Sequence, residues 1–446
     1  MVSVEHHTLC DGVQLQSIRD TKFKTFRISV HFLMPLAIET AAANALVPFL
    51  LTRATRRYPD FTLLSRKMDD LYGAGLGGDV GKIGDCQVLT VTASALANDY
   101  ALAGEDLVKE MTDVLCEALF DPVLEDGLFR EEDLRQEKRQ TLEQIDADFA
   151  DKRVWALQRC MEAMCADEPF GVGRFGSREA VAALTREAVT DAWRTMCRLS
   201  LKTISHPTRL AGRTMCRTAR VEILVLGDCD PRGVFESLKA AFANIERAYV
   251  PFAAAPAAAA PKTVRRAGDT EAVVQGKLVL GMRSPIYGSD PRVPAMRLMA
   301  GIFGGTPNGK LFLNVRERMS LCYYCSANYL PPKGFLFVQS GVEFSNMERA
   351  ESAILDQLAA VQRGNFTEED VATAKLSLCN SLLTAEDSLS VLDNWYLSQT
   401  FGERGLSPTE YAARVNAVGR EEILEAANTV QLDTVYRLTG KKEGSL

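Results

Sequence analysis

The chain has 446 residues, 47% hydrophobic and 24% charged, which is typical of globular proteins and excludes wholesale disorder. Lys and Arg number 51 against 58 Asp and Glu, a net charge of −7 that disfavours broad electrostatic capture of nucleic acid or anionic membrane. The apolar stretches near 28–38 and 41–51 are interrupted and too short to span a bilayer. The N-terminus lacks the basic and apolar regions of a signal peptide, so we expect a soluble, cytoplasmic protein.

Apolar periodicity predicts the same order of elements in each half of the chain. In the first half it predicts a strand over 26–32, helices over 41–53 and 63–71, a strand over 86–92 and an amphipathic helix over 105–119. In the second half it predicts a strand over 272–281, helices over 293–303 and 310–318, strands over 322–329 and 334–342, and an amphipathic helix over 347–361.

A segment rich in proline and alanine, Pro251–Pro261, separates these halves. Its composition is typical of a stiff connector and resists a packed core. We therefore predict an N-terminal domain over 1–248, a linker over 249–268 and a C-terminal domain over 269–446.

One short sequence occurs in both halves. Phe129-Arg-Glu-Glu-Asp133 followed by Lys138 matches Phe366-Thr-Glu-Glu-Asp370 followed by Lys375, with the same spacing. Each copy is predicted to open a long helix, with acidic residues in the first turn where the helix dipole favours them. We infer a duplicated α+β unit with a cleft between its copies, where chemistry is to be sought.

Eleven cysteines at irregular spacing suit a reducing compartment and argue against a disulfide framework. Cys322 and Cys325 form a C-x-x-C motif, but a zinc site would need a second pair, and a redox motif would need a helix start after the first cysteine. The segment is predicted as a strand, in which the two thiols would point to opposite faces. Structural cysteines are therefore the favoured interpretation.

Two other patterns are weak indicators of function. Gly304 to Lys310 fits the phosphate-loop spacing, but Leu311 stands where Ser or Thr would hold magnesium, and Pro307 lacks an N–H donor, so a turn before a helix is predicted instead. No two of the four histidines are spaced i, i+4 as in a hydrolytic zinc site; the four are His6, His7, His31 and His206. A Ser-His-Asp or Cys-His-Asn site stays open, because its members meet only in the fold.

The stretch from Gly304 through Arg316 to Tyr323 resembles the C-terminal signature of the M16 metallopeptidases, the family of insulinase, pitrilysin and the mitochondrial processing peptidase. The order of elements resembles that family over nearly the whole chain, as do Tyr58-Pro59 and Leu71-Tyr-Gly-Ala74. The resemblance implies an α+β fold of two homologous LuxS/MPP-like metallohydrolase-type α/β sandwich domains that arose by internal duplication.

Active members of that family carry His-x-x-Glu-His before the Tyr-Pro equivalent, which here falls on Ala45-Leu46-Val47-Pro48-Phe49. These side chains can neither ligate zinc nor accept a proton. The family's third ligand matches Glu137 or, less well, Glu143; alone it cannot hold a catalytic metal, and its alternative role is an exposed helix carboxylate. We therefore expect no metal cofactor and no catalytic residue in cis.

The resemblance also assigns Arg316 and Tyr323, seven residues apart, to an Arg–Tyr pair that stabilises the scissile carbonyl as it becomes tetrahedral. A guanidinium and a phenol are both hydrogen-bond donors, which suits a developing oxyanion. The alternative is structural: Arg316 would pair with a carboxylate and Tyr323 would be half-buried in a strand.

Within the family the chain resembles bacterial subunits that lack the zinc motif, in particular the elongation factor P 5-aminopentanol modification-associated proteins. We predict an inactive subunit that pairs with a zinc-bearing M16 subunit in a peptide-processing chamber, where Arg316 and Tyr323 bind the peptide substrate in trans. One alternative is a homo-oligomeric peptide-binding or scaffolding protein that holds extended peptide at a sheet edge. A further alternative is an independent hydrolase with an unrecognised nucleophile.

Overall fold

The computed structural model describes residues 3–197, 219–243, 245, 247, 249, 251 and 258–441. His206 lies outside the described residues, as do residues 250 and 252–257 of the linker predicted over 249–268. The chain divides into two compact units that are each discontinuous in sequence. Unit 1 comprises residues 1–145, 172–254 and 389–397, and unit 2 comprises residues 146–171, 255–388 and 398–446.

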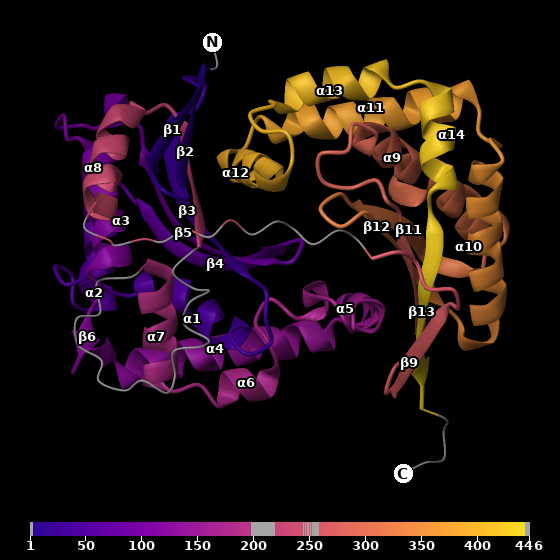
Figure 1. Cartoon of the computed structure of the whole chain (residues 1–446), viewed down its shortest axis with the longest axis horizontal. Helices are drawn as coiled ribbons and strands as arrows, with labels where there is room; N and C mark the ends of the chain where they lie inside the picture. Colours follow the sequence, from indigo (N-terminus) through magenta and orange to yellow (C-terminus); the bar gives the residue numbers. More distant parts are fainter. Residues whose placement is uncertain are drawn as a thin grey trace. The chain divides into compact units, whose positions relative to one another are not determined.

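Unit 1 is built on a six-stranded sheet in the order β1-β2-β8-β3-β5-β4 (Figure 1). Strands β2 and β8 run parallel, and the other neighbours run antiparallel. The strands are β1 Ser3–Cys10, β2 Val13–Arg19, β3 Thr25–Pro35, β4 Gly75–Ile83, β5 Cys86–Leu96 and β8 Arg220–Gly227, with a short hairpin of β6 Leu124–Glu125 and β7 Leu128–Phe129. The helices are α1 Ala41–Leu51, α2 Phe61–Asp70, α3 Leu107–Phe120, α4 Glu131–Ala150, α6 Arg178–Ala182, α7 Arg186–Cys197, α8 Pro231–Ala243 and α12 Leu389–Ser398.

Strand β3 shows how the pattern of this sheet sets its two faces. Its alternate residues Phe26, Ile28, Val30 and Phe32 are fully buried in the apolar core that α1 and α3 also enter. The residues between them, such as His31, point to the opposite face because side chains alternate along a strand. That second face is polar and yet buried, so its side chains must form hydrogen bonds to offset the free-energy cost of burial.

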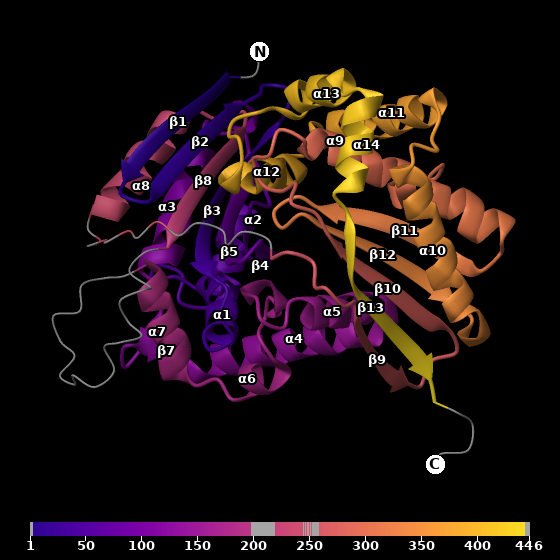
Figure 2. The same ribbon diagram turned by 45° about the vertical axis from the view of Figure 1, so that its right-hand side comes forward.

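Unit 2 is built on a five-stranded sheet in the order β11-β12-β10-β13-β9, in which β13 and β9 run parallel (Figure 2). The strands are β9 Arg265–Glu271, β10 Gly276–Arg283, β11 Cys322–Leu330, β12 Phe335–Val342 and β13 Gln431–Gly440. The helices are α5 Lys152–Met164, α9 Val293–Ala300, α10 Met347–Gln362, α11 Glu368–Ala385, α13 Pro408–Ala417 and α14 Arg420–Asn428, with π-helical segments Gly301–Gly305 and Leu311–Arg318.

The two sheets repeat one topology. The run β2-β8-β3-β5-β4 of unit 1 and the run β9-β13-β10-β12-β11 of unit 2 each begin with a parallel pair and continue antiparallel. The lysine of the repeated sequence makes the same kind of contact in both units. Nζ of Lys138 donates to the Leu184 carbonyl, and Nζ of Lys375 donates to the Asn416 carbonyl, each at 2.9 Å. The prediction of a duplicated α+β fold is confirmed.

Each unit is completed by a helix from the other half of the chain. Helix α5 belongs to unit 2, where Ala156 and Cys160 pack with Val279 and Phe337 in one apolar cluster. Helix α12 belongs to unit 1, where Asp393 is hydrogen-bonded to residues of β3. The two helices occupy the same position in the repeat, because each follows the long helix that the repeated sequence opens.

The predicted strands and helices of both halves are found with small shifts at their ends. The two large sheets also contain strands outside the predicted order, namely β1, β2, β4, β8, β9 and β13. The prediction that Cys322 and Cys325 point to opposite faces is wrong. The register of β11 against β12 shifts between Cys322 and Tyr324, so a β-bulge interrupts the alternation. Among the described residues, the helices are all too short or too polar to cross a bilayer.

Candidate functional site

Helix α1 carries the positions that the sequence analysis assigns to the metal motif of active M16 peptidases. Ala45 and Pro48 are buried, and Phe49 packs partly buried against the core of unit 1. Pro48 lies inside the helix, where it has no N–H to donate. Gly78 of β4 lies so close that an added Cβ would be 2.6 Å from the Pro48 carbonyl, so the strand and the helix are in tight contact. These positions therefore contribute packing and no polar chemistry.

An arginine holds Glu137, the carboxylate that the sequence analysis assigns to the third zinc ligand. Arg53 follows the end of α1, and its Nη1 lies 2.6 Å from Oε1 of Glu137, while its Nε lies 2.9 Å from Oδ1 of Asp133. Asp133 and Glu137 are one turn apart on α4, so both carboxylates face the same guanidinium. Glu137 is only 5% exposed, so the alternative interpretation of it as an exposed helix carboxylate is wrong. Glu143 is exposed and pairs with Arg139 at 3.7 Å.

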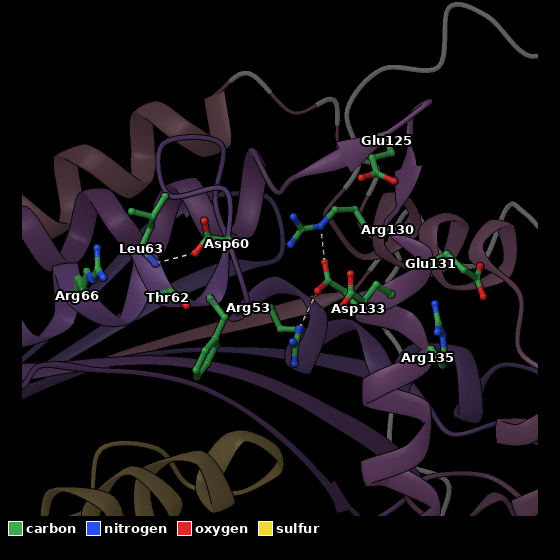
Figure 3. A pocket seen from close by; sticks show the side chains of 12 residues that line it. Arg53, Asp60, Thr62, Leu63, Arg66, Glu125, Arg130, Glu131, Asp133 and Arg135 are labelled. Atoms are coloured by element: carbon green, nitrogen blue, oxygen red, sulfur yellow. Dashed lines mark hydrogen bonds and ion pairs between the residues drawn. The ribbon is translucent and has the colours of Figure 1, made fainter.

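The cluster around Arg53 is electrostatically satisfied. Burial works against the charged guanidinium, but the hydrogen bonds and charges of Glu137 and Asp133 outweigh it and raise the pKa of Arg53. Asp133 also accepts from Nε of Arg130 at 2.6 Å, as Figure 3 shows. Arg53, Arg130 and Asp133 line a cavity of about 740 Å³ between the start of α2 and the start of α4, and its other lining residues are mostly charged.

This donor set does not fit a catalytic zinc ion. Zinc would need three protein ligands, and Ala45 and Phe49 supply none, while Glu137 is neutralised by Arg53. Over the described ranges, no group of three His, Cys, Asp or Glu side chains is arranged to hold a metal. Arg53 supplies the positive charge that a metal ion would otherwise bring to Glu137.

The structure places Arg316 and Tyr323 on the surface of unit 2. Arg316 lies on the π-helical segment Leu311–Arg318, where its side chain is 41% exposed and its guanidinium stacks over the Phe312 ring at 4.6 Å. Tyr323 lies in the edge strand β11, is 62% exposed, and donates from its hydroxyl to Glu343 at 3.4 Å. The alternative interpretation of Tyr323 as a half-buried strand residue is therefore wrong.

A buried polar network in unit 1 was missed by the sequence analysis. Nε2 of His31 lies 3.0 Å from Oδ1 of Asp393, and Nδ1 of His31 lies 2.8 Å from Oγ1 of Thr90. Asp393 also accepts from Arg27 and Ser29, each at 2.9 Å. The order hydroxyl–imidazole–carboxylate matches that of a hydrolase triad, but His31 and Asp393 are each only 2% exposed. The network anchors α12 to the polar face of β3.

The sequence held one signal for the Arg53 cluster: Asp133 and Glu137 lie one turn apart on a helix, beside the apolar Leu134, so a buried face there would need a cation. For the His31 network it held none, because Asp393 is more than 360 positions away from its partners in β3.

Comparison with known proteins places this geometry in a family. The model of the "Peptidase M16 inactive domain" matches residues 213–378. The chain is 29% identical to the "Probable inactive metalloprotease YmfF" of Bacillus subtilis over 436 residues, which cover 97% of each chain.

Two solved structures share its fold. A conserved protein from Enterococcus faecalis superposes with a TM-score of 0.87 and 27% identity, covering 99% of this chain and all of the other. A peptidase M16 inactive domain from Pseudomonas fluorescens superposes with a TM-score of 0.75 at 16% identity, covering both chains in full. The family match, the full-length relative and the missing zinc ligands agree. Over nearly its whole length, the chain is similar to M16-family peptidase-like proteins that are described as inactive.

Proposed function

We propose that the chain is a non-catalytic subunit that assembles with a zinc-bearing M16 subunit and presents Arg316 and Tyr323 to the peptide held at that subunit's metal. A contrast between two places in the chain carries the proposal. At the degenerate motif, Ala45 and Phe49 offer no ligand, and Arg53 neutralises Glu137. In unit 2, by contrast, the two donors expected to bind substrate are retained and exposed.

The chemistry of the two exposed donors suits this role. A guanidinium and a phenol can both donate to the oxygen of a carbonyl that gains negative charge as it becomes tetrahedral. The ion pair of Arg316 with Glu317 spans 3.5 Å and is exposed, so it is weak and easily exchanged for a substrate contact. The hydrogen bond from Tyr323 to Glu343 is similarly long at 3.4 Å. Neither residue contributes much to the fold.

The test is to purify the chain together with an active M16 subunit encoded beside it and to measure peptide hydrolysis. Replacing Arg316 with Ala should lower kcat of the complex by about a hundredfold, the usual cost of losing an oxyanion donor, while the two subunits still copurify. The matched control is Arg318→Ala, because Arg318 is exposed on the same helical segment and should leave the rate unchanged. An Arg316→Ala complex with the wild-type rate would contradict the role in trans.

A second candidate function is a homo-oligomeric protein that binds extended peptide by strand addition. The observation that favours it is β4, an edge strand of the unit 1 sheet in which an added Cβ at Gly77 or Gly81 would meet nothing within 4 Å. Exposed edge strands pair readily with another chain. Size-exclusion chromatography separates the two functions: a stable homodimer that ignores the active subunit favours peptide binding. The link to the elongation factor P group stays a prediction.

A further inference from the structure

The bulge in β11 brings together two cysteines that regular strand alternation would separate. Cys322 pairs with Val342 of β12 and Tyr324 pairs with Gly341, so Tyr323 is an extra residue without a partner in the ladder. Such an extra residue changes which face the next side chains reach. As a result, Cys322 and Cys325 lie opposite Val342 and Ser340, which are two positions apart on β12, and both side chains reach the same buried face of the sheet.

The surroundings make the two thiols unequal. The interaction with the Cys325 thiol, the Ser340 hydroxyl and the charge of Arg316 lower the pKa of Cys322 against the effect of burial. The interaction with Cys322 and burial raise the pKa of Cys325. The pair thus combines a thiolate-forming sulfur with a neighbour that keeps its proton.

We propose that Cys322 and Cys325 form a peroxide-sensitive dithiol, in which a hydroperoxide oxidises Cys322 and Cys325 then closes a disulfide. Cys322 is 9% exposed in an edge strand, directly before the exposed Tyr323, so a small oxidant needs only a slight displacement to reach it. Other cysteines of the chain are free thiols as well, namely Cys10, Cys86, Cys116, Cys160, Cys165, Cys229 and Cys379. Among them, Cys86, Cys116, Cys160 and Cys229 have pKa values that burial raises, so they are the less reactive ones.

The reaction balances with hydrogen peroxide as the oxidant. The Cys322 thiolate attacks one peroxide oxygen, the O–O bond breaks, and the departing hydroxide takes a proton to become water, which leaves a sulfenic acid on Cys322. The sulfur of Cys325 then attacks the Cys322 sulfur, the S–S bond forms, and the S–O bond breaks. The Cys325 proton leaves with the hydroxyl group as a second water. The two thiols lose two electrons, and the peroxide is reduced to water.

The bulge also provides the freedom that ring closure needs. A disulfide requires Cα atoms within about 7 Å of each other. Tyr323 is unpaired in the ladder, and β11 has a partner on one side only, so the strand can tighten here without disturbing the pairing of β10 with β12.

The test uses the reduced, full-length protein treated with graded hydrogen peroxide, blocked with a maleimide and digested with trypsin. The peptide Met319–Lys333 contains Cys322 and Cys325 and no other cysteine. It should lose two hydrogen atoms in mass and cease to react with maleimide, about tenfold faster than the Cys229 thiol is lost. Met319 is 48% exposed and serves as an internal measure of the peroxide dose.

Two variants assign the roles. Cys325→Ser should leave Cys322 as a sulfenic acid that dimedone traps, whereas Cys322→Ser should leave Cys325 reduced. Cys229→Ser is the matched control and should behave as wild type. A wild-type peptide in which Met319 is oxidised to sulfoxide while both cysteines still react with maleimide would overturn the proposal, and this measurement does not depend on the folding of any variant.

Discussion

Nη1 of Arg53 and Oε1 of Glu137 are joined across 2.6 Å, with the two side chains only 15% and 7% exposed. The pair connects the end of α1 to the middle of α4, at the place where active relatives are expected to bind their metal. An internal cation thus satisfies a buried carboxylate that would otherwise be uncompensated. The stability of unit 1 should accordingly rest on this arginine and not on an ion from solution.

Replacing Arg53 alone should destabilise the protein strongly. Arg53→Ala leaves Glu137 charged and buried, and removing one partner of a buried pair costs about 3 kcal/mol of unfolding free energy. Adding Glu137→Gln to Arg53→Ala should recover part of that loss, because the uncompensated charge disappears. Urea denaturation measures both values. Equal free energies for the single and double variants would contradict the argument.

Metal should have no effect on the stability of the protein. The carboxylates of Asp133 and Glu137 already face Arg53, so zinc has no set of ligands to compete for. We expect the same Tm with added zinc, with a chelator and with neither, and less than one equivalent of zinc by elemental analysis. A clear rise in Tm with zinc at micromolar concentration would show that the donor set has been misjudged.

Acid should weaken the attachment of α12 through Asp393. Burial would raise the pKa of Asp393, but the charges of His31 and Arg27 and the hydrogen bonds from His31 and Ser29 prevail and lower it. Because the folded pKa lies below the unfolded value of about 3.9, the ionised group stabilises the fold above that pH, and this contribution is lost as the pH falls through the folded pKa. Asp393→Asn should be less stable at neutral pH, with a shallower loss of stability in acid. Parallel curves of unfolding free energy against pH would refute this.

Removing Arg316 should make Cys322 less reactive. The positive charge of Arg316 helps to lower the pKa of Cys322, so Arg316→Ala should shift the pH profile of Cys322 oxidation to higher pH. Arg318→Ala is the control, and it should leave the profile in place. The readout is the rate of disulfide formation in the peptide Met319–Lys333, measured from pH 6 to pH 9. Identical pH profiles for Arg316→Ala and Arg318→Ala would show that the charge of Arg316 does not affect the reactivity of Cys322.

Local periodicity was enough to predict the central strands and several helices of each unit. The alternation of residues in β3 and the apolar spacing in α3 each indicate a buried face. The repeated sequence lies at the start of α4 and of α11, as expected. At α11 the start is fixed by a capping box between Thr367 and Asp370. Such signals lie within a few residues of each other, so a sequence reveals them directly.

The rest depends on contacts between distant segments. Arg53 and Glu137 are 84 positions apart, and the sequence around each residue does not indicate that it pairs with the other. The bulge at Cys322 depends on the register with β12, which one strand alone does not encode. A periodic pattern shows that a face of a strand or helix is buried, but it does not show which element covers that face. Helices α5 and α12 are the clearest example, because each covers a sheet built from the other half of the chain.

The exchange of helices has a consequence for biosynthesis. The polar face of β3 cannot be covered by α12 until residue 393 has left the ribosome, when nearly nine-tenths of the 446-residue chain has been made. Helix α5 likewise keeps its apolar side exposed until its partner strands β10 and β12 have been translated, more than a hundred residues later. A nascent chain of this protein is therefore a natural client for chaperones that shield unfinished domains, and neither half is expected to mature when it is expressed alone.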